Sequence, residues 1–207
     1  MIAIIDYGVG NLFSLKSSLL AINANAVVTN DEETIKSAEK IILPGVGAFE
    51  DAAKKLRDSG LAELIVEEAK NGKPILGICL GMQLLFQKSF EYGEHEGLGL
   101  IPGEVRAIEE VIPKGLKIPH IGWNQLEFVG EKSNLFKHIQ EGDCVYFVHS
   151  YYAAKCEDYV IAQSEYGAPL TAAVANGNIF GCQFHPEKSG NVGLNILRAF
   201  CETEAIS

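Results

Sequence analysis

The stretch Pro74-Ile75-Leu76-Gly77-Ile78-Cys79-Leu80-Gly81-Met82 decides the fold, because an apolar run ends there and a helical pattern begins. Residues 74–79 are typical of a buried strand, and a helix is expected to begin with residues 82–86. A cysteine flanked by Gly77 and Gly81 at such a turn is the cysteine form of the nucleophile elbow. The turn lifts the side chain off the sheet, and a helix N-terminus favours the reactive thiolate. We interpret Cys79 as a nucleophile; the alternative is a buried core cysteine.

The same order of strand and helix recurs before this stretch. Apolar runs that alternate with helical patterns are typical of parallel strands covered on both faces. Strands are expected at residues 2–5, 26–29 and 40–43, the last ended by Pro44. Helices are expected at residues 12–22 and 48–70, the second broken near Gly60.

The second half of the chain has a different pattern, because strands dominate from Gly103 onward. Asn176-Gly177 between two apolar runs favours a hairpin, so that some strands pair antiparallel. We predict one α/β domain, residues 1–207, with a central, mostly parallel sheet, helices on both faces and some antiparallel strands in the C-terminal half. The strands expected here are residues 105–108, 125–128, 145–148, 160–163, 170–175 and 179–184, before a closing helix at 191–200.

The composition of the chain disfavours several classes of protein. The chain has 207 residues, 47% of them hydrophobic, and a net charge of −10, which disfavours nucleic acid as a partner. Its five cysteines form no CxxC pair, so we expect no disulfide framework, no metal site and a reducing cytoplasm. The first residues lack a basic leader, and no apolar stretch approaches the ~20 residues of a membrane span, so neither a signal peptide nor membrane insertion is expected.

A base for the cysteine is expected at His185, which directly follows the strand 179–184. Pro186 fixes a turned path after it, so that the carboxylate of Glu187 can orient the imidazole. The carboxyl ends of parallel strands meet at one edge of a sheet, which can bring His185 to Cys79. His-Pro-Glu alone would more often be a surface turn, but together with the elbow it predicts a catalytic triad.

Attack on a carboxamide produces an oxyanion, which needs backbone N–H donors. Pro44-Gly45-Val46-Gly47 follows another strand, and its glycines would let the N–H groups around Val46 and Gly47 turn toward a substrate. The N–H of Leu80, next after the nucleophile, is the second candidate donor. The alternative for this segment is a plain strand-to-helix turn.

Three ordered motifs together resemble the class I (triad) glutamine amidotransferases over nearly the whole chain: residues 44–47, 77–85 and 184–189. The resemblance implies that L-glutamine is the substrate and that Cys79 forms a glutamyl thioester. It also implies that His185 acts as acid and base, that Glu187 orients it, and that no cofactor is needed. Gly45 and Gln83 match positions that hold the substrate. The segment with His149, Ser150 and Tyr151 resembles one whose backbone binds the α-amino acid end, so His149 need not be catalytic.

Within this family the chain is similar to the glutaminase subunits of imidazole glycerol phosphate synthases. That similarity implies a heterodimer with a (β/α)8-barrel cyclase subunit, which receives ammonia through a channel and acts in histidine biosynthesis. The residues that carry the similarity are Asp6 to Asn11, Pro44 to Phe49, Ile118 to Asn124, Tyr146 to Tyr151 and Pro186 to Ser189.

Trp123 is the only tryptophan and lies among glycine and asparagine, not in an apolar strand. A lone tryptophan is more often a core residue, but tryptophan also anchors interfaces, and the resemblance implies that this loop contacts the cyclase. We expect Trp123 and Asn124 at the partner interface, and Asn11 and Lys188 by the same resemblance.

Other functions fit the sequence less well. Gly8-Val9-Gly10 suggests a dinucleotide fingerprint, but Phe13 stands where the third glycine should be, and no P-loop pattern occurs. The remaining alternatives are an amidotransferase subunit of another synthase, a hydrolase of the same fold, and a non-catalytic binding module. The intact Cys79, His185 and Glu187 argue against the last.

Overall fold

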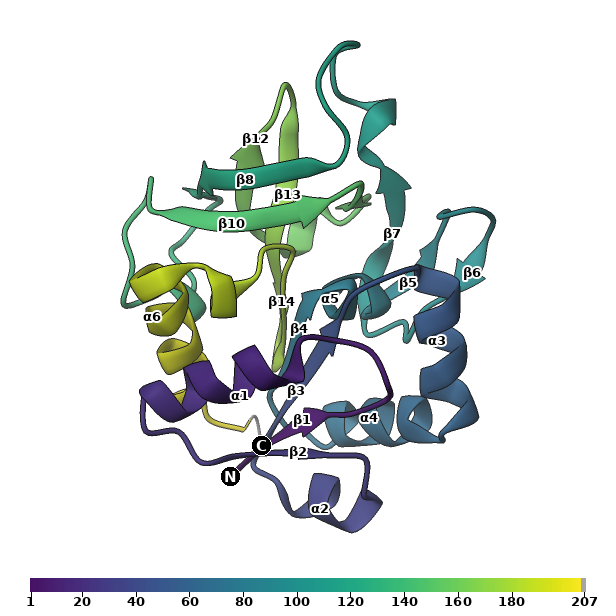
Figure 1. Cartoon of the computed structure of the whole chain (residues 1–207), viewed down its shortest axis with the longest axis vertical. Helices are drawn as coiled ribbons and strands as arrows, with labels where there is room; N and C mark the ends of the chain where they lie inside the picture. Colours follow the sequence, from purple (N-terminus) through teal and green to yellow (C-terminus); the bar gives the residue numbers. More distant parts are fainter. Residues whose placement is uncertain (206–207) are drawn as a thin grey trace.

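All four residues of the first strand, β1 (Ile2–Ile5), are buried, and successive residues pack on opposite faces of the sheet. Ile2 and Ile4 pack in one apolar cluster, whereas Ala3 and Ile5 pack in the other. The computed structural model describes residues 1–205, and helices cover both faces of the main sheet (Figure 1). The strand is therefore buried on both sides, as expected for a parallel sheet.

The main sheet has eight strands, of which the first five in spatial order are parallel and the last three antiparallel. The fold class predicted from the sequence is therefore confirmed. The predicted hairpin at Asn176-Gly177 is also confirmed, because Asn176 pairs with Ile179. In spatial order the strands are β2 (Ala26–Thr29), β1, β3 (Lys40–Gly45), β4 (Ile75–Cys79), β14 (Ile179–Cys182), β13 (Pro169–Asn176), β12 (Val160–Glu165) and β9 (Glu127–Phe128).

The two faces carry different helices. α1 (Leu12–Ala21) and α6 (Gly190–Cys201) cover one face, and α2 (Glu32–Ser37), α3 (Phe49–Asp58) and α4 (Leu61–Lys70) cover the other. Gly60, with a φ of +74°, separates α3 from α4 where the sequence predicted a break. Within residues 1–205 no helix is both long and apolar enough to cross a bilayer.

Two smaller sheets complete the fold. β8 (His120–Gln125) and β10 (Cys144–His149) form an antiparallel ribbon that packs on β12 (Figure 1). The other sheet has the order β11 (Tyr151–Ala154), β7 (Ile101–Ala107), β5 (Phe86–Ser89) and β6 (His95–Glu96). Short 3-10 turns lie at η1 (Ile108–Glu110), η2 (Asn134–Phe136), η3 (Glu157–Tyr159) and η4 (Pro186–Lys188).

Three expectations about local structure were wrong. Pro44 does not end β3, which continues to Gly45, because the pairing of β3 with β1 ends at Ile42 and no donor is needed there. The helix after the elbow, α5 (Leu80–Leu84), is short, since Phe86 already begins β5. The segment around Trp123 is the strand β8, not a loop, because pairing with β10 overrides the poor strand propensity of glycine and asparagine.

Candidate active site

Cys79 occupies a sharp turn between the end of β4 and the start of α5. Its φ of +55° and ψ of −113° are strained for a residue with a side chain. Both flanking glycines are needed at this turn. A Cβ on Gly81 would lie 1.8 Å from the carbonyl oxygen of Leu43, and a Cβ on Gly77 would lie 2.7 Å from that of Gly81. The local geometry is that of the elbow predicted from the sequence.

Three neighbouring strands of the main sheet end around Cys79. β3 ends at Gly45, which pairs with Cys79 itself, and β14 ends at Cys182, which pairs with Ile78. Because β14 ends at Cys182 and not at residue 184 as predicted, Gln183 follows the strand directly and His185 lies two residues further on. The site therefore forms at the carboxyl edge of a parallel sheet, where open α/β folds place their sites.

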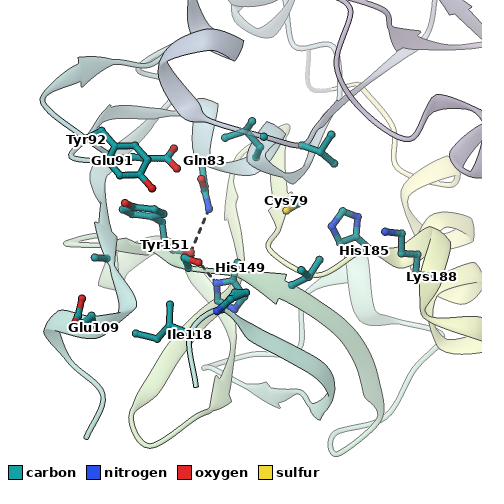
Figure 2. Close-up of a pocket in the computed structure, with 17 residues that line it drawn as sticks. Cys79, Gln83, Glu91, Tyr92, Glu109, Ile118, His149, Tyr151, His185 and Lys188 are labelled. Atoms are coloured by element: carbon teal, nitrogen blue, oxygen red, sulfur yellow. Dashed lines mark hydrogen bonds between the residues drawn. The ribbon is translucent and has the colours of Figure 1, made fainter. Parts of the chain in front are cut away.

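His185 lies beside the Cys79 sulfur (Figure 2). Its Nδ1 is 2.8 Å from Oε1 of Glu187, and the two side chains are only 3% and 4% exposed. Because a carboxylate only accepts, Nδ1 carries a proton and Nε2 remains for the sulfur. Burial by itself would lower the pKa of His185. The Cys79 side chain and the Glu187 carboxylate outweigh burial and raise this pKa to about 9. The structure therefore brings the three predicted triad residues together.

Backbone contacts hold this histidine in place. The N–H of His185 donates to the carbonyl of Tyr146 on β10 at 3.0 Å. The Ser189 hydroxyl donates to the carbonyl of His185 at 2.6 Å and accepts from the N–H of Tyr146 at 3.0 Å. Ser189 thereby ties the turn after β14 to β10, a role that sequence reasoning missed although the residue belongs to a quoted motif.

His149 is buried and cannot serve as the base. Its Nδ1 lies 2.8 Å from the carbonyl of Tyr151, and its Nε2 lies 3.1 Å from Nδ1 of His120. Because a carbonyl only accepts, His149 is protonated at Nδ1 and accepts at Nε2 from His120. Burial lowers the pKa of His149 to about 4, so this ring stays neutral. Binding of the α-amino acid end of a substrate by the backbone of this segment stays a prediction.

A cavity of about 590 Å³ opens beside Cys79 and His185, a size suited to a small molecule. It brings together most of the residues predicted to bind glutamine or the oxyanion. Gly45 is not among its walls; this residue is buried in β3, and a Cβ there would lie 2.8 Å from the N of Gly81. The walls include Val46, Gly47, Leu80, Gln83, Glu91, Tyr92, His149, Ser150, Tyr151 and Lys188 (Figure 2).

Two buried polar side chains in this region were missed by sequence reasoning. Glu91 reaches the cavity and accepts a hydrogen bond from the N–H of Phe49 at 2.6 Å, and burial raises its pKa. Gln183 is fully buried and contacts both Gln83 and Cys79. No local motif could have revealed Glu91. The position of Gln183, two residues before His185, was a signal that could have found it.

Val46 and Gly47 are exposed and loosely surrounded, unlike the buried elbow at Cys79. Val46 is 42% exposed, and Gly47 has a φ of +96° with nothing within 4 Å of an added Cβ. Just before them, the hydroxyl of Tyr7 donates to the carbonyl of Pro44 at 2.7 Å. The segment is thus anchored at the end of β3 and open beyond it.

The residues predicted for a partner interface lie in different settings. Trp123 is 58% exposed on β8. Lys188 is exposed and lines the cavity, with its Nζ 5.9 Å from the ring centroid of Tyr146. Asn11 caps α1 by accepting from the N–H of Ser14 at 3.4 Å. The Asn124 amide donates to the carbonyl of Glu165 on β12 at 2.8 Å, so its contact is within the chain.

The arrangement suits acyl transfer through a cysteine nucleophile. A thiolate at Cys79 can attack a carbonyl carbon, His185 can move a proton, and the N–H of Leu80 stands next to the nucleophile. Within residues 1–205 no group of three histidine, cysteine, aspartate or glutamate side chains could hold a metal ion.

Known proteins are similar to this chain over nearly its whole length. The family described as glutamine amidotransferase class-I matches residues 3–203. A protein of Caldanaerobacter subterraneus named imidazole glycerol phosphate synthase subunit HisH is 51% identical over 203 residues, 98% of each chain. A protein of the same name from Wolinella succinogenes is 47% identical over 204 residues, covering 98% of this chain and 99% of its own.

Solved structures share the fold at lower identity. A crystal structure of a glutamine amidotransferase aligns with a TM-score of 0.76 at 19% identity, over 98% of both chains. The structure of PurLQS from Thermotoga maritima aligns with a TM-score of 0.72 at 22% identity, over 96% of both chains. The family resemblance inferred from the sequence motifs is confirmed: this chain belongs to the class I glutamine amidotransferases.

Proposed function

We propose that this chain is the glutaminase subunit of an imidazole glycerol phosphate synthase and supplies ammonia from glutamine to a cyclase subunit. Relatives of that name, 51% and 47% identical over nearly the whole chain, support the assignment. The observation that carries the glutaminase activity is Cys79 at a strained elbow beside the His185–Glu187 pair. In this role the ammonia serves histidine biosynthesis, in which the cyclase makes imidazole glycerol phosphate and an aminoimidazole carboxamide ribotide.

The first half of the reaction forms a thioester. The Cys79 thiolate attacks the carboxamide carbon of glutamine, and the oxyanion is held by backbone N–H groups of Leu80 and the Val46–Gly47 segment. His185, charged and oriented by Glu187, gives its proton to the amide nitrogen. The carbon–nitrogen bond breaks, ammonia leaves, and a glutamyl thioester remains on Cys79.

The second half regenerates the enzyme. His185, now neutral, takes a proton from a water molecule, whose oxygen attacks the thioester carbon. The carbon–sulfur bond then breaks, the sulfur leaves as a thiolate that the imidazolium stabilises, and glutamate departs. Glutamine and water are thus converted to glutamate and ammonia.

Glutamine is held by groups that complement both of its ends. The cavity wall holds the carboxylates of Glu91 and Glu109, of which Glu91 lies beside Tyr151 (Figure 2) and suits the α-ammonium; Ser150 and Tyr151 line the same cavity. The Gln83 amide donates to the carbonyl of Tyr151 at 3.3 Å, so its oxygen is left to accept from the substrate.

The partner surface lies at the rim of the same cavity. Trp123 and Ile121 are 58% and 57% exposed on β8, and Ile118, which lines the cavity, is 42% exposed. An aromatic anchor with apolar neighbours next to a basic side chain, Lys188, is typical of a protein interface. We propose that a (β/α)8-barrel cyclase covers this rim in a heterodimer and receives ammonia through a channel.

Replacing the nucleophile tests the proposal. We expect Cys79→Ala to abolish glutamine hydrolysis while the complex with the cyclase still makes imidazole glycerol phosphate from free ammonium salt. Cys144→Ala, which removes an exposed cysteine, is the matched control and should leave both reactions unchanged. Glutamine turnover by Cys79→Ala, or a wild-type complex that cannot use ammonium, would contradict the assignment.

A further inference from the structure

Gln183 is a fully buried amide that contacts the nucleophile, although no part of the mechanism above uses it. It lies one residue beyond the pair formed by Cys182 of β14 and Ile78 of β4, so the sheet register brings it level with Cys79. Its backbone N–H donates to the carbonyl of Ala172 at 2.8 Å, which holds it from the side of β13. Its Nε2 lies 3.7 Å from the Cys79 sulfur.

The orientation of this amide follows from a single backbone carbonyl. The carbonyl of Tyr151 only accepts, so the Gln83 atom 3.3 Å from it must be the amide nitrogen. The same nitrogen lies 3.0 Å from the Gln183 side chain, which must therefore present its oxygen there. The NH₂ of Gln183 is left to point at the sulfur. The Gln83 amide nitrogen therefore donates both to the carbonyl of Tyr151 and to Gln183, and Gln183 in turn donates to Cys79.

We propose that Gln183 is a further catalytic residue, which donates a fixed hydrogen bond to the Cys79 thiolate and at the same time sets the orientation of Gln83. His185 contacts the sulfur from another direction, but it must give its proton away during each turnover. An amide N–H does not ionise near neutral pH, so Gln183 can stabilise the sulfur anion both before it attacks glutamine and when it leaves the thioester. This inference rests on the proposed cysteine chemistry and adds the group that holds the anion.

Two substitutions separate the two contacts of Gln183. Gln183→Glu has the same shape and still presents an oxygen to Gln83, but it offers no N–H to the sulfur and adds a titratable group beside it. Gln183→Leu removes both contacts. We expect Gln183→Glu to lower kcat for glutamine in the complex with the cyclase about tenfold or more, with KM nearly unchanged, and Gln183→Leu to lower kcat and raise KM.

Alkylation of the full chain by iodoacetamide measures the reactivity of the Cys79 sulfur in the absence of glutamine. Peptide-resolved mass spectrometry follows Cys79, and the exposed Cys144 in the same tube is the internal reference. We expect the pH midpoint of Cys79 alkylation to rise by about one unit in both variants, roughly a tenfold loss of rate at neutral pH. The other ionisable groups that act on Cys79 are His185, Tyr7 and Cys182, and both variants retain them. Gln183→Leu adds no titratable group, so its alkylation profile reports the lost N–H without a new charge.

The outcomes are distinct. A purely structural role predicts lower melting temperatures but an unchanged alkylation profile, and that result in Gln183→Leu would overturn the inference. Wild-type kcat in Gln183→Leu would overturn it as well. Failure of the proposed function looks different, because the wild-type complex would then not hydrolyse glutamine at all.

Discussion

The two parts of the site that handle charge are built in opposite ways. The elbow at Cys79 is buried and strained. Neighbouring backbone packs so closely against Gly77 and Gly81 that neither position has room for a side chain. Val46 and Gly47, which are proposed to stabilise the oxyanion, are exposed, and Gly47 has free space around it. The difference indicates that the nucleophile is preformed by the fold, whereas the anion stabiliser can change its alignment. A partner that covers the rim of the cavity can then control the alignment of the anion stabiliser without disturbing the nucleophile.

Crowding at the elbow should produce the largest effect. Gly81→Ala places a Cβ 1.8 Å from the carbonyl oxygen of Leu43, so β3 and α5 must separate. We expect a loss of about 3 kcal/mol or more in the free energy of unfolding and no measurable glutaminase activity. Urea unfolding and glutamine turnover in the presence of the cyclase measure the two effects. Stability and activity close to wild type would show that the elbow is not rigid.

The second-largest effect is expected from replacing Glu187, the carboxylate that orients His185. Glu187→Gln removes a charge that raises the pKa of His185, so we expect kcat/KM to fall ~10²–10⁴-fold and its basic limb to move below pH 9. The folded-state pKa of about 9 exceeds the ordinary 6.5, so protonated His185 stabilises the fold fully below pH 6.5, and this is lost as pH rises through 9. The variant should lose part of that stabilisation.

An NMR titration of the His185 ring measures its pKa directly. Glu202→Gln is the matched control, because Glu202 forms a similar pair with His138, at 2.8 Å, on the surface. An unchanged His185 pKa in Glu187→Gln would remove Glu187 from the triad.

Gly47→Ala tests the Val46–Gly47 segment, which is proposed to adjust its alignment. Its effect is to be compared with that of Gly81→Ala in the rigid elbow. The added Cβ meets no atom, but the φ of +96° is unfavourable for alanine, so the resting conformation is destabilised by about 1–3 kcal/mol. We expect the ratio between cyclase-stimulated and basal glutaminase rates to fall about tenfold, while the exposed segment relaxes and the melting temperature changes little. An unchanged ratio would mean that this segment does not set the activation.

The partner contact should show the smallest effect on the chemistry. We expect Trp123→Ala to weaken association with the cyclase about tenfold, because an exposed tryptophan on β8 is a typical interface anchor. Leu20→Ala, which shortens another exposed apolar side chain, is the control. Titration calorimetry measures both, and wild-type affinity in Trp123→Ala would remove this residue from the interface.

Prediction from the sequence succeeded where the information is local. The spacing of Gly77, Cys79 and Gly81 specifies one kind of turn, and proline after His185 fixes the path to Glu187. Parallel pairing then follows from the apolar runs, and it brings the three segments to one edge.

Prediction failed where distant contacts decide. The strand at Trp123 contains glycine and asparagine, and only its pairing with β10 makes it a strand. Glu91 reaches the cavity from a loop between β5 and β6, and Gln183 becomes meaningful only once Gln83 and Tyr151 are placed beside it. Nothing in the local pattern around Glu91 indicates such a contact.

Comparing two rates with and without the cyclase tests the central contrast most directly. Iodoacetamide reacts with Cys79 by displacement at carbon and forms no oxyanion, whereas glutamine hydrolysis needs the oxyanion to be stabilised. We predict that saturating cyclase raises the glutaminase rate at least tenfold and changes the rate of Cys79 alkylation less than twofold. Parallel increases in both rates would show that the partner builds the nucleophile itself, and would contradict a preformed elbow with an adjustable anion stabiliser.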